Sequence, residues 1–81
     1  MPRRALTTDE LLSALAEIAG DGYCARHDLE QRFPRVAGRD FRRALARGVN
    51  GGLLLSRRVA GGTHLALSPE GWRNLRGEET T

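Results

Sequence analysis

The chain has 81 residues, a net charge of +3 and a single cysteine, and 40% of its residues are apolar. This length suits one domain, so we expect a single domain over residues 1–81 with an ordered core over about 7–76. No apolar run approaches the ~20 residues of a membrane helix, and one cysteine cannot form an intrachain disulfide. The first residues lack the apolar stretch of a secretory signal, so we expect a cytoplasmic protein without a membrane partner.

Positive charge is concentrated in the middle of the chain. All thirteen basic residues are arginine, and residues 26–58 hold nine of them against three acidic residues. The segments before and after this stretch each contain more acidic than basic residues. A GC-rich genome explains the preference for arginine over lysine, but each guanidinium can still pair bidentately with a phosphate or a guanine edge. The asymmetry indicates an anionic partner.

Two helices are predicted in the first part of the chain. Thr7 and Glu10 have the spacing of a capping box, and an apolar stripe at helical spacing follows over residues 8–19. A second helix is expected over about residues 26–33. Pro34 ends it, because the residue before a proline disfavours the helical region.

A third helix is predicted over residues 38–50. Its buried face consists of residues that recur at helical spacing, namely Phe41, Ala44, Leu45, Gly48 and Val49. At 100° per residue, the opposite face carries Arg39, Arg43, Ala46 and Asn50, with Arg42 and Arg47 on its flanks. The exposed side of this helix is therefore expected to be rich in arginine.

Two strands and a last helix are predicted after the third helix. Residues 53–56 and 64–67 alternate in the pattern of half-buried strands, with Leu53 and Leu55 on one face, and residues 60–62 supply the turn. The sequence SPEG from Ser68 then has the cap, first-position proline and early acidic residue of a helix start.

The four aromatic side chains are all expected to point inward. Tyr23 lies in what reads as a short extended link with Cys24, and the others are Phe33, Phe41 and Trp72. A platform that stacks the bases of single-stranded nucleic acid is therefore not expected.

The order of elements predicts a mainly α fold with a small β-hairpin, an α+β winged helix-turn-helix with the order α-α-α-β-β-α. The stretch FRRALARGVNGGLLLSRRVAGGTHLAL, residues 41–67, resembles the last helix and wing of small winged-helix DNA-binding domains, including the linker-histone globular domain. The stretch LALSPEGW, residues 65–72, resembles the wing-to-helix junction of MarR-type regulators. The chain lacks the Lys-rich tails of the former and the long dimerisation helices of the latter.

The resemblance implies that the third helix enters the major groove of DNA, where outward residues reach base edges. The candidate contacts on this helix are Arg39, Arg42, Arg43, Ala46, Arg47 and Asn50. Arg39 and Arg43 suit guanine or phosphate, Ala46 a thymine methyl and Asn50 an adenine. A solvated arginine-rich face, with Asn50 as an ordinary C-terminal helix residue, is the alternative interpretation.

The hairpin and the second helix supply further candidates. In the hairpin, or wing, they are Arg57, Arg58, Gly61, Gly62, Thr63 and His64. Its glycines allow close approach to a phosphate backbone or a minor groove, but they suit an ordinary hairpin turn equally well. Arg26, Arg32 and Arg35 are candidates for phosphate contacts that position the protein without reading sequence.

No catalytic, cofactor or metal site is predicted. The serines show no acid–histidine pairing, and no glycine loop has a phosphate-cradling pattern, so we expect no enzyme and no cofactor. Cys24, His27 and His64 could in principle hold a metal, but a buried cysteine and a solvated histidine are the expected roles without a second cysteine pair.

Three functions remain open. The leading hypothesis is a double-stranded DNA-binding protein, a small transcriptional regulator that acts as a homodimer in the cytoplasm at the nucleoid. The second is a nucleoid or architectural protein that binds DNA without sequence preference. The third is a winged-helix interaction module or inhibitor whose basic face binds an acidic protein partner.

Overall fold

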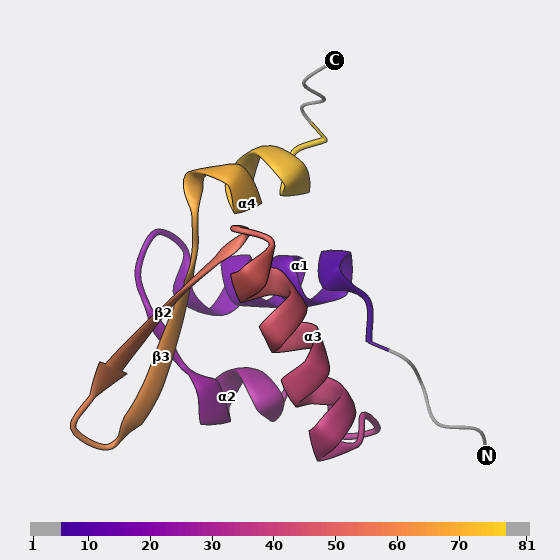
Figure 1. Cartoon of the computed structure of the whole chain (residues 1–81), viewed down its shortest axis with the longest axis vertical. Helices are drawn as coiled ribbons and strands as arrows, with labels where there is room; N and C mark the ends of the chain where they lie inside the picture. The colour runs from indigo at the N-terminus through magenta and orange to yellow at the C-terminus, as the bar shows by residue number, and fades with distance from the viewer. Residues whose placement is uncertain (1–5, 78–81) are drawn as a thin grey trace.

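The computed structural model describes residues 6–77. Its elements follow the order α1 (Thr8–Ala19), β1 (Cys24–Ala25), α2 (Arg26–Glu30), α3 (Gly38–Asn50), β2 (Leu54–Val59), β3 (Gly62–Leu67) and α4 (Pro69–Leu75). Figure 1 shows α1, α2 and α3 beside a hairpin of β2 and β3 that projects beyond them. The predicted α+β class and the order of helices and hairpin are confirmed, and the arrangement is a small winged-helix-like fold. No helix within residues 6–77 is long and apolar enough to cross a membrane.

Local capping explains why α1 and α4 begin where the sequence predicts. The Thr7 hydroxyl accepts a hydrogen bond from the Glu10 amide at 3.2 Å, and the Glu10 carboxylate accepts one from the Thr7 amide at 3.1 Å. Gly20 ends α1 with a φ of 57°, a conformation that favours glycine. At the start of α4, the Ser68 hydroxyl accepts from the Gly71 amide at 3.0 Å.

The second helix is shorter than predicted. α2 ends at Glu30, whereas the sequence suggested an end near Phe33. The Phe33 amide donates to the Glu30 carbonyl at 3.0 Å, a three-residue spacing that tightens the chain into turns after the helix. Pro34 disfavours the helical region for Phe33, so the chain leaves the α-helix before reaching it.

The sheet contains a strand that the sequence did not predict. Its order is β1-β3-β2, all antiparallel, with Cys24 opposite Leu65 and Leu54 opposite Leu67. Cys24 was expected in an extended link, but β3 supplies the hydrogen-bonding partner that makes it a strand. The predicted alternation in β2 also needs correction, because Leu54 is only 2% exposed while Leu55 is 43% exposed.

The core lies between α1, α3 and the inner face of the sheet, where the largest fully buried side chains are Leu11, Leu12, Leu15, Leu29, Phe41 and Leu65. Two residues predicted to be buried are exposed. Val49 is 36% exposed because it lies about 80° around α3 from Phe41, at the margin of the buried arc. Tyr23 is 44% exposed because Cys24, its neighbour in an extended segment, faces the core.

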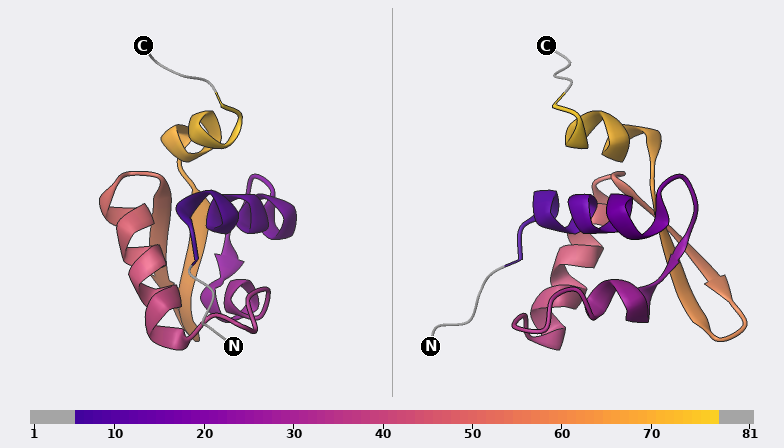
Figure 2. Two further views of the ribbon diagram at one scale, coloured as in Figure 1. Left: turned by 90° about the vertical axis from the view of Figure 1, so that its right-hand side faces the viewer. Right: turned by 180° about the vertical axis from the view of Figure 1, so that it is seen from behind.

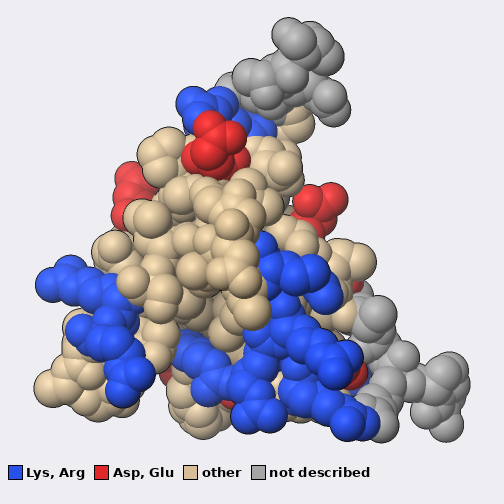
Figure 3. All heavy atoms as spheres, viewed as in Figure 1, with Lys and Arg blue, Asp and Glu red and all other residues tan. Residues whose placement is uncertain are grey.

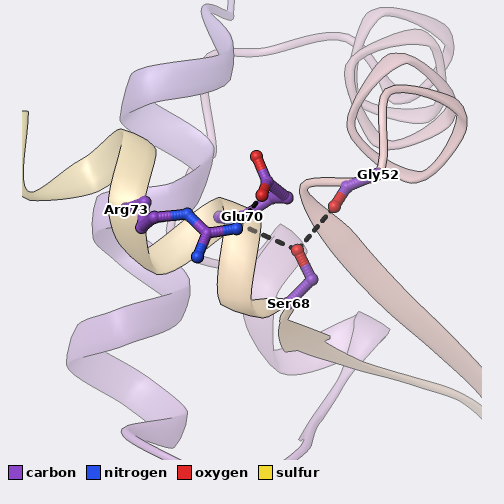
Figure 4. A network of polar contacts seen from close by, with 5 residues as sticks. Gly52, Ser68, Glu70 and Arg73 are labelled. Atoms are coloured by element: carbon purple, nitrogen blue, oxygen red, sulfur yellow. Dashed lines mark hydrogen bonds and ion pairs between the residues drawn. The ribbon is translucent and has the colours of Figure 1, made fainter. Parts of the chain in front are cut away.

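Ser68 links α4 to the connection between α3 and β2 (Figure 4). Its hydroxyl donates to the Gly52 carbonyl at 2.5 Å, and its amide donates to the Leu53 carbonyl at 3.1 Å. A Cβ added to Gly71 would lie 2.2 Å from the Leu53 carbonyl oxygen, so only glycine permits this approach. The C-terminal end of α3 is thereby held in a fixed position relative to α4 and the sheet.

Candidate nucleic-acid interface

The outward face of α3 is formed by the residues that the sequence predicted. Because Phe41, Ala44, Leu45 and Gly48 are buried, the opposite side of the helix faces solvent. All six candidates on this helix are exposed: Arg39, Arg42, Arg43, Ala46, Arg47 and Asn50. They span about 17 Å along the helix axis. In the left view of Figure 2, α3 lies along one outer edge of the molecule.

Three arginines on this face carry uncompensated charge. Among residues 6–77, no carboxylate lies within salt-bridge distance of Arg39, Arg42 or Arg43. Arg47 differs, because its guanidinium donates to the Leu6 carbonyl at 3.3 Å and so joins α3 to the segment before α1. The N-terminal half of α3 therefore presents the free cations, and its C-terminal half is partly used in packing.

The hairpin separates the two arginines that the sequence grouped together. Arg57 lies opposite His64 and Arg58 opposite Thr63 in the register of β2 and β3. Successive side chains of a strand point to opposite faces, so Arg58 shares the face of the buried Leu54 and Arg57 lies on the outer face. Both arginines are exposed, while Thr63 and His64 are half-buried.

The turn of the hairpin depends on its glycines. Gly61 has a φ of 101° and Gly62 a φ of 139°, conformations that side chains rarely adopt. Because a Cβ on either residue would meet no neighbour within 4 Å, backbone conformation and not crowding requires glycine here. The tip of the hairpin is therefore narrow and bare of side chains at these two positions.

Two arginines of the candidate surface stack on aromatic rings. The Arg57 Cζ atom lies 5.7 Å from the centroid of the Tyr23 ring, and the Arg26 Cζ atom lies 5.7 Å from the centroid of the Phe41 ring. Both contacts join different elements of the fold. Neither was predicted, because strand register and helix packing bring these residues together and no short sequence motif marks them.

The three candidates around α2 do not form one group. Arg26 is half-buried over Phe41, whereas Arg32 pairs with Glu17 of α1 at 2.5 Å. Arg35 is exposed in the connection between α2 and α3. Arg32 therefore has its charge offset by a carboxylate, while Arg26 and Arg35 have no such partner among residues 6–77.

Charge is distributed unevenly over the surface. On the face shown in Figure 3, basic side chains gather over α3 and over the hairpin, and most of the visible acidic side chains lie toward the α4 end. At that end Arg73 forms an ion pair with Glu70. The arrangement provides two separate cationic areas on one face, spaced by uncharged surface.

The described residues offer little for other chemistry. Cys24 is buried, and burial, together with the charge of Asp28, raises the pKa of its thiol, so it remains protonated at neutral pH. His27 is exposed, and its Nε2 atom is hydrogen-bonded to the Gln31 Nε2 atom at 3.0 Å. Within residues 6–77, no three His, Cys, Asp or Glu side chains are grouped so as to hold a metal ion.

Comparison with protein-family models found none that matches this chain, and comparison with curated proteins found no relative.

Proposed function

We propose that this protein binds double-stranded DNA, with α3 in the major groove and the hairpin on the backbone or in the minor groove. The observation that carries the proposal is the row of exposed arginines on the outward face of α3 that have no carboxylate partner among residues 6–77. The fold gains no stability from Arg39, Arg42 and Arg43 through carboxylates of residues 6–77, but each of these arginines can bind phosphate or a guanine edge. The resemblance of residues 41–67 to winged-helix DNA-binding domains points the same way.

Ala46 and Asn50 favour a degree of base reading over purely electrostatic binding. They lie on the same side of α3 as Arg39 and Arg43, and both are exposed. Alanine permits close approach to a thymine methyl, and asparagine can pair with adenine. A small transcriptional regulator acting as a homodimer fits this surface, since one such domain covers few base pairs.

The test is a fluorescence-anisotropy titration of labelled duplexes, of random and of selected sequence, at two salt concentrations. If about five arginines contact phosphate, log affinity falls with log salt at a slope of about −4.5. The double variant Arg39→Ala and Arg43→Ala should flatten that slope by about 1.8 and weaken binding. A nearly flat slope for the unaltered protein would contradict the proposal.

A matched control removes the same charge elsewhere. Arg73→Ala and Arg76→Ala together delete two arginines of α4 and its end, at the opposite end of the molecule from the hairpin tip. We expect this pair to change affinity far less than the α3 pair. Equal losses for both pairs would mean that net charge, and not the α3 surface, drives binding. Equal affinity for random and selected duplexes would favour an architectural protein that binds DNA without sequence preference. Binding to an acidic protein but not to duplexes would favour a protein-interaction module.

A further inference from the structure

Arg57 differs from the arginines of α3 because its guanidinium is held against an aromatic ring. Its Cζ atom lies 5.7 Å from the centroid of the Tyr23 ring. Tyr23 immediately precedes β1 and Arg57 belongs to β2, so the contact reaches across the central strand β3. Tyr23 is 44% exposed, and its ring therefore contributes little to the buried core.

The strand register explains why these two side chains meet. Arg57 lies opposite His64, and His64 lies opposite Ala25. Tyr23 precedes Ala25 by two residues and so points to the same, outer face of the sheet. A long side chain can reach a diagonal neighbour on the same face of a sheet. The contact therefore follows from the three-stranded arrangement, and a hairpin without β1 would lack it.

An aromatic ring holds a guanidinium without cancelling its charge. The face of the ring attracts the cation, while the N–H groups at the edge of the guanidinium stay free to donate to phosphate oxygens. A carboxylate in the same place would occupy those donors, as Glu17 does for Arg32. The Tyr23 ring also restricts the rotamers of Arg57 before any ligand arrives, which lowers the entropy lost on binding.

We propose that Tyr23 is a positioning residue for DNA binding, and that it acts by holding Arg57 ready for a phosphate on the outer side of the hairpin. This inference rests on the proposed DNA-binding function. Arg58 points to the other face of the hairpin and has no aromatic partner among residues 6–77. The two neighbouring arginines therefore differ in their dependence on Tyr23.

The test compares Tyr23→Leu, which removes the ring, with Tyr23→Phe, which keeps it. Binding of the full chain to a fluorescein-labelled random duplex is followed by anisotropy at low salt. Tyr23→Leu should weaken binding by about two- to fivefold, the range of an exposed cation–π contact, while Tyr23→Phe should bind like the unaltered protein. Leu55→Ala is a matched control, because Leu55 is 43% exposed and comes from β2 beside the same contact. It should leave the affinity unchanged.

A double-mutant cycle separates positioning from a general structural effect. Once Arg57→Ala is present, Tyr23→Leu should cause no further loss, whereas with Arg58→Ala the two losses should add. Full additivity with Arg57→Ala would overturn the inference. In the free protein, the Arg57 δ protons should resonate upfield because of the Tyr23 ring current, and Tyr23→Leu should abolish that shift while thermal unfolding shows that the variant is folded.

The two proposals fail in different ways. If the unaltered protein binds the duplex and Arg57→Ala weakens binding but Tyr23→Leu does not, the role of Tyr23 is wrong and the DNA-binding function stands. If the unaltered protein does not bind the duplex at all, both proposals are wrong.

Discussion

Replacing Gly71 with alanine should disturb the docking of α4 more than any comparable change in the described chain. The added Cβ would lie 2.2 Å from the Leu53 carbonyl oxygen and 3.0 Å from the Leu67 Cδ2 atom. The Leu53 carbonyl oxygen belongs to the backbone of the connection between α3 and β2, so it cannot move aside by a side-chain rotation. α4 therefore has to move by at least about 1 Å to restore ordinary contact distances.

The cost can be estimated from what this movement breaks. Overpacking of this kind costs about 1–3 kcal/mol, and loss of the bond between the Ser68 hydroxyl and the Gly52 carbonyl costs about 1 kcal/mol. The higher helix propensity of alanine raises the free energy of unfolding by about 1 kcal/mol and so offsets part of this loss. We expect a net loss of about 2 kcal/mol in the free energy of unfolding. For a domain of this size, that loss lowers Tm by about 8–16 °C.

Urea and thermal unfolding, followed by the fluorescence of the single tryptophan Trp72, measure this loss directly. Gly38→Ala is the control, because the nearest atom to its added Cβ is a Glu30 carboxylate oxygen at 3.9 Å. It should leave stability unchanged or raise it by up to about 1 kcal/mol. A Gly71→Ala protein as stable as the unaltered one, or equal losses for the two variants, would refute the reasoning.

Three further changes test other parts of the fold. Gly48→Ala should cost less than Gly71→Ala, about 1 kcal/mol by urea unfolding, because the 2.7 Å approach is to the Leu54 Cδ1 atom, the end of a flexible side chain. Ser68→Ala should cost about 1–2 kcal/mol, since it removes the cap of α4 together with the bond to the α3–β2 connection. Because burial and the Asp28 charge raise the pKa of the Cys24 thiol, the unfolded chain loses this proton at a lower pH than the folded protein. The free energy of unfolding should therefore fall as pH rises above the ordinary thiol pKa, and Cys24→Ala should reduce that slope; an identical slope would contradict the assignment.

Prediction from sequence succeeded where the signal was local. The capping box at Thr7 and Glu10 and the cap at Ser68 are formed between residues three apart, so their sequence spacing is sufficient to place α1 and α4. The range of α3 and four of its five predicted buried residues are also correct, because helical periodicity is a local property. The exposed arginines on its outward face follow from the same periodicity.

Prediction failed where partners distant in sequence decide the outcome. The β1 strand exists only because β3 lies beside Cys24 and Ala25 in the fold. The exposure of Tyr23 follows from that pairing, and so does its contact with Arg57. Arg32 likewise pairs with Glu17 of α1, fifteen residues away in the sequence, and no motif around α2 indicated this contact.

Taken alone, the order of the residues determined α1, α3 and α4, the place of the hairpin and the concentration of arginine on one side of α3. These depend on capping bonds, periodicity and backbone freedom, which act within a few residues of the chain. Only the tertiary structure decided which arginines stay uncompensated and which are held by a ring or a carboxylate. That outcome depends on strand register and helix packing, because these set the neighbours of each cation and therefore how much of its charge remains available to a ligand.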